Sequence, residues 1–438
     1  MALNTRHFFL SVVYATALSW LLLNEIVPRW SYMNYRGEFS GLGLAVALCA
    51  SAILGLSVPH GKNTRAMIVA CLNYMFFVPS AVYVSFHGIT FNYIFSFLFS
   101  VLGVYYISRI RISVPVIASI KKEDAINLCM GFIFVALLAQ AYFGGLRYFN
   151  LNITRVYEFR SLAASEIPAF FGYISSSVSS VIIPTALIIS INFKRYRSSL
   201  FIVLLSVILF GMDHHKTTLF VPFILVMLYI FFVYSKQTSA IGIIFILITL
   251  FCISEFVYMR YIIDSDGIAY INSYIIRRVI FTPAMLDSIF VNFFSSNEKY
   301  YWATSRFGSW AMESPYPVTA PYLIGEKYFS DPSMGANTGM IGSGFSNAGL
   351  YGVFLYSMVV GMLISSLNVY GKRIGHATVA AVSLVSVFYV VTTTDLTTAI
   401  LSHGLLLLLV MLSLFSGPAE RGADNGAQTL ALPRPAGH

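Results

Sequence analysis

Residues 239–259 read SAIGIIFILITLFCISEFVYM and carry one charged side chain, Glu255, near their end. Because a helix rises 1.5 Å per residue, about 20 such residues cross the roughly 30 Å hydrocarbon core of a bilayer. A helix that is apolar on every side over this length is typical of a membrane span. The stretch therefore predicts a transmembrane helix.

The rest of the chain has the same character. Of its 438 residues, 58% are hydrophobic and only 10% are charged, whereas soluble domains carry about 25% charged residues. The formal net charge is +9, yet no basic soluble segment is present to bind nucleic acid. The cysteines lie inside apolar runs, where they predict neither disulfides nor metal ligands; they are Cys49, Cys71, Cys129 and Cys252. The composition predicts an all-α polytopic membrane protein.

Apolar runs of similar length, each with at most one charged residue, recur along the chain, about twelve in all. They are 8–25, 39–58, 66–86, 92–108, 125–144, 172–192, 198–211, 217–234, 239–259, 346–367, 377–394 and 398–416. No small-residue cleavage site follows the first run, so we expect it to be retained as a span. Together they predict one integral membrane domain over 1–416, followed by a Gly-, Ala- and Pro-rich tail, 417–438, which is expected to be disordered.

The positive charges predict the orientation of these spans. With a cytoplasmic N-terminus, the inner connections contain many cations and only two acids, Glu123 and Asp124. Cytoplasmic loops typically show this bias, so both termini are predicted to be cytoplasmic. The cations are Lys62, Arg65, Arg109, Arg111, Lys121, Lys122, Lys194, Arg195, Arg197, Lys236, Lys372 and Arg373.

One further apolar stretch, Val279–Phe294, contains Pro283 and Asp287 and stops short of a full span. If it crossed the membrane, Lys372 and Arg373 would lie outside, against the charge bias. An interfacial or re-entrant helix on the outer side is therefore the expected structure.

Two outer connections, about 145–171 and 260–345, are much longer than the others, and long loops are often functional. The first holds Arg155, Glu158 and Arg160 within six residues. Paired guanidinium groups suit a diphosphate, and a carboxylate between them can orient an arginine or act as a base. The alternative is a surface ion pair of little energetic value.

The second long loop offers more cations and a cluster of aromatic residues. Arg277 and Arg278 precede an apolar stretch at the expected head-group depth, where they either bind phosphate or anchor the chain to the interface. Residues 299–317, KYYWATSRFGSWAMESPYP, add Arg306 among aromatic side chains. Tyr and Trp suit sugar rings and membrane interfaces equally well.

The turn GMDHHKTT, residues 211–218, places His215 and Lys216 at the outer surface. A metal site is disfavoured, because adjacent histidines do not share a helical face and no spaced His or Cys set supports them. Phosphate binding or proton transfer is one alternative. Simple helix termination is the other.

A glycine-rich segment, GANTGMIGSGFSNAGLYG, residues 335–352, leads into a predicted span and contains Asn337 and Asn347 as binding candidates. It lacks the GK[ST] of a nucleotide phosphate loop. Backbone amides at a helix N-terminus, with Asn347 as a cap, are one interpretation. A tight turn is the other, with Gly349 and Gly352 permitting close helix packing.

Four segments carry a family resemblance: TRVYEFR (154–160), DHHKTTLFVP (213–222), RRVIFTPAMLDSIFVNFF (277–294) and ANTGMIGSGFSNAGLYG (336–352). With the twelve runs and two arginine-containing outer loops, the chain resembles the bacterial O-antigen polymerases, the Wzy-type oligosaccharide repeat-unit polymerases. That family is described by arginine-to-glycine spacings of ten and fifteen intervening residues. Here Arg160 and Gly172 have eleven residues between them, and no arginine of the second loop meets the longer spacing.

The resemblance implies a GT-C-like inner-membrane glycosyltransferase that works at the periplasmic face without a nucleotide sugar, metal or cofactor. Its partners would be undecaprenyl-diphosphate-linked glycan donor and acceptor, membrane lipids and a chain-length regulator of the polysaccharide co-polymerase kind. On this resemblance Arg155, Arg160 and Arg278 are expected at the diphosphate, with Lys216 assisting. Glu158 or His215 would act as the base. The further binding candidates are Arg277, Arg306, Asn337 and Asn347.

Three alternatives remain. The first is an O-antigen ligase, which would share the lipid-linked donor and differ in its acceptor, or a polymerase of another polysaccharide. A flippase or transporter should show charged or broken helices at mid-membrane depth, but the runs hold few ionisable residues, such as Glu255 and His403. A structural scaffold would leave the arginine-containing loops unexplained.

Overall fold

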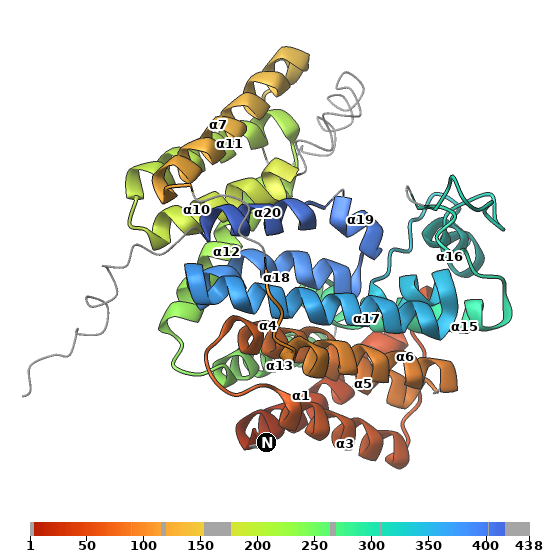
Figure 1. The fold of residues 1–438 in the computed structure, drawn as a ribbon. Coiled ribbons are helices and arrows are strands. Elements are labelled where there is room, and N and C mark those ends of the chain that lie inside the picture. Colours follow the sequence, from red (N-terminus) through yellow and green to blue (C-terminus); the bar gives the residue numbers. More distant parts are fainter. Residues whose placement is uncertain are drawn as a thin grey trace, which may run out of the picture.

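The computed structural model describes residues 4–88, 90–114, 120–152, 177–262, 269–305, 308–401 and 403–416, and these fold as helices and their connections (Figure 1). The α-helices are α1 (Thr5–Leu21), α2 (Val27–Trp30), α3 (Gly41–Ser57), α4 (Thr64–Leu72), α5 (Val78–His87), α6 (Phe91–Val101), α7 (Lys122–Gln140), α10 (Ile183–Asn192), α11 (Tyr196–Asp213), α12 (Lys216–Tyr234), α13 (Ser239–Val257), α14 (Tyr270–Asn272), α15 (Thr282–Ser296), α16 (Ala320–Phe329), α17 (Met340–Ile374), α18 (His376–Thr392), α19 (Leu396–Leu401) and α20 (Leu405–Phe415). Short π- and 3-10-helical turns extend or join them at Leu22–Ile26, Ser31–Met33, Asn73–Phe77, Leu102–Tyr106, Ile107–Arg109, Ala141–Gly145, Val178–Ile182, Tyr258–Ile262 and Ser273–Phe281.

Length and composition identify the chain as a polytopic membrane protein. Within the described residues, 8 helices are long and apolar enough to cross a membrane. They are Thr5–Met33, Thr64–His87, Phe91–Arg109, Glu123–Gly145, Tyr196–Asp213, Ser239–Ile262, Tyr270–Ser296 and Met340–Ile374. Shorter apolar helices, such as Gly41–Ser57 and His376–Thr392, accompany them.

Every predicted apolar run overlaps a helix, but the last run is interrupted. Residues 398–416 do not form one helix, because α19 ends at Leu401 and α20 begins at Leu405. Gly404 between them has a φ of +73°, a left-handed conformation that glycine adopts without strain. The break leaves His403 in a connection rather than inside a span. The predicted disordered tail, 417–438, lies outside the described residues.

Several connections meet at one end of the bundle, which we call the basic end. The backbone N–H of Thr64 donates to Nδ1 of His376 over 3.2 Å, and the Asn192 side-chain amide donates to the carbonyl of Ile374 over 3.3 Å. These bonds join the connections after α3, α10 and α17, which the charge pattern had assigned to the cytoplasm. Cations of this end include Lys62, Arg65, Lys194, Arg195, Lys236, Lys372 and Arg373.

The opposite end, which we call the loop end, holds residues 297–305 and 308–339. Asn34, after the first helix, donates its side-chain amide to the carbonyl of Tyr328 over 2.7 Å. On the other side, Asn92 in the first turn of α6 donates to Oγ of Ser295 over 2.8 Å. The second long loop therefore folds back onto the helix ends.

The helix that contains the apolar stretch 279–294 is longer than the sequence suggested. It runs over Tyr270–Ser296, so the expectation that it is too short to cross a membrane is wrong. It begins earlier because Glu255 of α13 accepts the backbone N–H of Asn272 over 3.0 Å and stabilises its first turn. Ser295, at its other extremity, also bonds at the loop end. Its placement at the interface stays a prediction.

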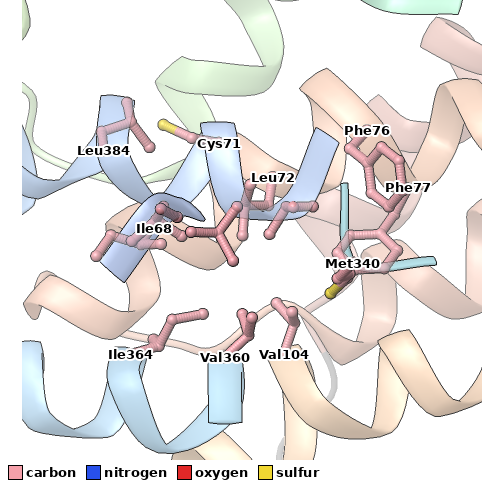
Figure 2. Packing of buried hydrophobic residues seen from close by; sticks show 14 of the residues in the cluster. Ile68, Cys71, Leu72, Phe76, Phe77, Val104, Met340, Val360, Ile364 and Leu384 are labelled. Carbon is pink, nitrogen blue, oxygen red and sulfur yellow. The ribbon is translucent and has the colours of Figure 1, made fainter. Parts of the chain in front are cut away.

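Helix Thr64–His87 forms the centre of the bundle, because 94% of its most apolar window is buried. Figure 2 shows its side chains Ile68, Leu72 and Phe76 in the same core as Val360 and Ile364 of α17. In helix Ser239–Ile262 the corresponding share is only 28%. Many of its large apolar side chains, such as Leu247 and Phe251, are exposed, as expected for a lipid-facing surface.

The glycine-rich segment forms a tight turn within α17, as one interpretation predicted. The backbone leaves the helical conformation at Ala348 and Gly349, and Gly349 has φ +60° and ψ −142°. Across the bend, a Cβ added to Gly352 would lie only 2.0 Å from the carbonyl oxygen of Gly344. Glycines are therefore required where the two parts of α17 touch.

The predicted capping role of Asn347 is wrong, because α17 begins at Met340 and Asn347 lies inside it. The first turn is instead bound by Asp287 of α15, whose Oδ1 accepts the backbone N–H of Gly342 over 3.0 Å. The Thr338 hydroxyl donates to the same oxygen. A carboxylate from a neighbouring helix thus replaces a local cap.

Candidate functional site

A polar cavity of about 270 Å³ opens at the loop end. Its walls come from the first turn of α16, the first two turns of α17 and Phe290 of α15. Residues 300–305, residues 393–398 at the start of α19, and His403 complete them. In Figure 1 these elements lie together at the right of the molecule, beside α15, α16 and α19. The volume lies just below the roughly 300–1,000 Å³ usual for small-molecule sites, so it suits a small ligand or one end of a larger one.

Hydroxyl, amide and aromatic groups dominate the lining. The neutral polar residues are Thr304, Ser305, Thr319, Asn337, Thr338, Ser343, Ser346, Asn347, Thr393, Thr394, Thr397 and Thr398. The aromatic residues are Phe290, Tyr300, Trp302 and Tyr322. Lys and Arg are absent from the described lining, and Asp395 is its acidic residue. Neutral hydrogen-bonding groups beside flat apolar rings suit a ligand that carries many hydroxyl groups.

Asp395 is half-buried, and side chains of α17 fix one of its oxygens. The Tyr356 hydroxyl donates to Oδ1 over 2.8 Å, and the Asn347 amide lies 3.4 Å from the same atom. Tyr356 in turn accepts from the indole N–H of Trp302 over 2.8 Å. The ring of Trp302 and the carboxylate of Asp395 are therefore parts of one hydrogen-bonded chain.

The second oxygen of Asp395 binds the start of α19. Oδ2 accepts the backbone N–H of Thr397 over 2.9 Å and also its hydroxyl proton. This is the geometry of an N-cap, which satisfies a backbone donor at a helix start. Since donors reach both oxygens, the carboxylate is held in one orientation.

The segment that presents Trp302 is strained. Tyr301 and Trp302 have φ angles of +48° and +63°, and non-glycine residues rarely occupy this region. The turn persists because α17 accepts its backbone donors: Tyr300 N–H bonds to the Ser346 carbonyl over 2.9 Å, and Trp302 N–H bonds to Oδ1 of Asn347 over 3.1 Å. Such strain tends to occur at functional sites, where surrounding bonds enforce it.

His403 contributes the imidazole of the cavity. Its ring lies beside Tyr389, with 6.1 Å between the ring centres. Burial lowers the pKa of His403 below its usual value near 6.5, because the cationic form loses its hydration. At neutral pH the ring is therefore uncharged.

Two of the residues predicted from the sequence reach this cavity. Asn347 lies almost completely buried in its wall, and Asn337 is exposed at its edge. Both come from the glycine-rich segment. Of the other candidates, Arg155, Glu158, Arg160 and Arg306 lie outside the described residues, as does the side chain of Lys216.

Arg277 and Arg278 do not line the cavity. Arg277 stacks over the ring of Trp30 at 4.1 Å and donates to Oγ of Ser273 over 3.2 Å. These contacts join the helix before α15 to the end of the first helix. Anchoring to the membrane interface stays a prediction. Arg278 is exposed on another side of the same helix.

His215 is also not among the residues that line the cavity. Its backbone N–H donates to Oδ1 of Asp213 over 2.8 Å, and the Thr218 hydroxyl donates to Oδ2 over 2.7 Å. His214, between Asp213 and His215, has a left-handed backbone conformation and ends α11. The turn between α11 and α12 thus has the hydrogen bonding expected for helix termination.

The sequence did not single out Asp395, Tyr356 or His403 as site residues, and it predicted the aromatic stretch 299–317 as a sugar-binding candidate without ranking Trp302 in it. A signal was present, because Asp395 stands in TTTDLTT, residues 392–398, a polar stretch between two apolar runs. Its length alone predicts a short connection between two spans, and nothing else local marks it as a site.

No family model, curated protein or solved structure matches the chain.

Proposed function

We propose that the chain is a membrane-embedded glycosyltransferase of the O-antigen polymerase kind. It would join undecaprenyl-diphosphate-linked oligosaccharide units at the periplasmic face of the bacterial inner membrane. The growing chain would leave its lipid diphosphate and pass to the non-reducing end of a new unit. No cofactor takes part in this proposal.

The observation that carries the proposal is the cavity at the loop end. Sugars present many hydroxyl groups and apolar ring faces, and the lining combines Ser, Thr and Asn side chains with Tyr300 and Trp302. A fixed carboxylate, Asp395, stands in the same wall. A transporter would instead be expected to hold its substrate near mid-membrane depth, between helices.

The charge distribution supports the proposed orientation. Cytoplasmic connections carry an excess of Lys and Arg, so the basic end would face the cytoplasm and the cavity would open to the periplasm. In this arrangement the twelve predicted runs would cross the membrane, the last of them as the interrupted pair α19 and α20, with His403 in the connection near the outer face. Helix Tyr270–Ser296 would lie at the outer interface. Both termini would then be cytoplasmic.

The diphosphate would bind beside this cavity rather than inside it. A glycosyl diphosphate leaving group gains negative charge as its bond breaks, and fixed cations stabilise that charge. The cavity wall offers neutral groups in its described part, so the cations would come from the arginine-containing loops. Arg155, Arg160 and Arg278 remain the candidates from the sequence.

A lipopolysaccharide gel tests the proposal. In a host that lacks this gene, the ladder should collapse to a core-plus-one-repeat band, and the wild-type gene should restore it. Trp302→Ala should fail to restore the ladder, because it removes both the aromatic face and the donor to Tyr356. Trp310→Ala is the matched control, since Trp310 is 83% exposed and lies outside the lining; it should restore the ladder.

The remaining outcomes separate the alternatives, provided that each variant reaches the membrane at wild-type abundance. Core without any repeat unit in the deletion host would indicate a ligase or a flippase. An unchanged ladder would exclude O-antigen assembly as the function of this chain.

A further inference from the structure

We propose that the cavity is the acceptor-sugar subsite and that Asp395 is the base that deprotonates the attacking hydroxyl group. This inference rests on the proposed glycosyl transfer and adds the catalytic residue. A general base must lie within hydrogen-bond distance of the proton it removes, in a wall that the substrate reaches. Asp395 satisfies the positional requirement, because it lines the cavity and is only half-buried.

The hydrogen bonds of Asp395 leave a position for a substrate hydroxyl at Oδ1. The Asn347 amide is the most distant donor there, at 3.4 Å, and it makes a shorter bond of 2.9 Å to the Ser343 carbonyl. An acceptor hydroxyl can therefore replace the weakest contact of the carboxylate without breaking the bond from Tyr356. The Tyr356 and Thr397 bonds keep the carboxylate oriented during this exchange.

The lining also distinguishes the acceptor from the donor. The acceptor end of a glycan is uncharged, whereas the donor carries a diphosphate next to its reacting carbon. A wall of Ser, Thr, Asn and aromatic residues suits the uncharged end. The reacting hydroxyl would then lie at the carboxylate, with its ring against Trp302.

In the chemical step, the acceptor oxygen forms a bond to the anomeric carbon of the donor sugar. The bond between that carbon and the diphosphate oxygen breaks, and its electron pair stays on the lipid diphosphate. The hydroxyl proton passes to Asp395, which later releases it to water. The donor supplies the leaving group, so no further reactant is required.

Asp395 could serve only as the N-cap of α19, through its contact with Thr397. Two substitutions distinguish this structural role from that of a base. Asparagine caps a helix about as well as aspartate but cannot take up the proton at neutral pH. Glutamate is a poorer cap but retains a carboxylate. If Asp395 only caps the helix, Asp395→Asn should be more active than Asp395→Glu. If Asp395 is the base, Asp395→Glu should be more active than Asp395→Asn.

The experiment uses the full-length protein in lipid nanodiscs with undecaprenyl-diphosphate-linked repeat units isolated from a polymerase-deficient strain. Wild type should extend these units. Asp395→Asn should lower the rate at least 100-fold, since positioned bases contribute about 10²–10⁴-fold. Its thermal unfolding midpoint should fall no further than that of Asp395→Glu, because asparagine keeps the N-cap bond. Asp395→Glu should be at least tenfold faster than Asp395→Asn.

Asp331→Asn is the matched control. Asp331 makes the same local bonds, because its Oδ1 accepts the N–H and hydroxyl of Ser333 over 2.8 and 2.6 Å, but it is exposed and outside the lining. Its rate should match wild type. If Asp395→Asn keeps its rate within tenfold, or exceeds Asp395→Glu, Asp395 is not the base while the polymerase function stands. If wild type extends no chain, the proposed function fails, and the assignment of Asp395 fails with it.

Discussion

Tyr301 and Trp302 show how single residues are forced into place at the cavity. Each adopts a left-handed φ that costs roughly 1–2 kcal/mol for an L-residue. Ser346 and Asn347 compensate by accepting the backbone donors of the turn. The indole ring is therefore fixed over the cavity by bonds from α17 and not by its own local preference.

His403 gives a prediction about the pH dependence of stability. Burial lowers its pKa in the folded protein, so the unfolded chain binds a proton more readily. Stability should therefore fall as the pH decreases below about 6.5, the pKa of an unperturbed histidine. In His403→Gln, the thermal midpoint should decline less steeply between pH 7.5 and 5, as measured in detergent. Parallel curves for the two proteins would contradict this account.

At the scale of elements, Asp287 joins α15 to the start of α17. Its side chain is completely buried, and Oδ1 accepts from Thr338 and from the backbone of Gly342. Asp287→Ala would leave both donors unpaired, which costs about 1–3 kcal/mol for each buried group. The thermal midpoint should therefore fall clearly.

Asp287→Asn is the control for that prediction, because its amide oxygen still accepts from Thr338 and Gly342. It should retain more stability than Asp287→Ala. Equal midpoints for the two variants would show that the contact between α15 and α17 does not depend on this acceptor.

The elements were largely predictable from the sequence, and the site was not. Apolar runs such as 239–259 decide helix positions by composition alone, and each of them overlaps a helix. Asn337 and Asn347 were predicted because they stand in the glycine-rich segment that leads into an apolar helix, and both line the cavity although the capping role predicted for Asn347 is wrong. The bond between Tyr356 and Asp395 joins residues 39 positions apart and exists only because α17 packs against α18. The sequence around either residue does not predict such a contact.

At the scale of the whole molecule, the separation of the basic and loop ends predicts the orientation. Lys194 at the basic end and Glu313 in the second long loop are both exposed. In a chain whose natural cysteines are replaced, Glu313→Cys should react with an impermeant maleimide added outside spheroplasts. Lys194→Cys should react only after permeabilisation. The opposite labelling pattern would overturn the proposed topology.

The size of the cavity has a consequence for polymer length. At about 270 Å³ it encloses a short piece of glycan and no more. As proposed, the cavity receives the free end of each incoming unit. Every round of synthesis then begins with the same contacts, whatever the length of the chain already made. Such an active site does not sense the length of the polymer. The final size of the polysaccharide must then be decided by how long the product stays bound, or by another protein that measures it.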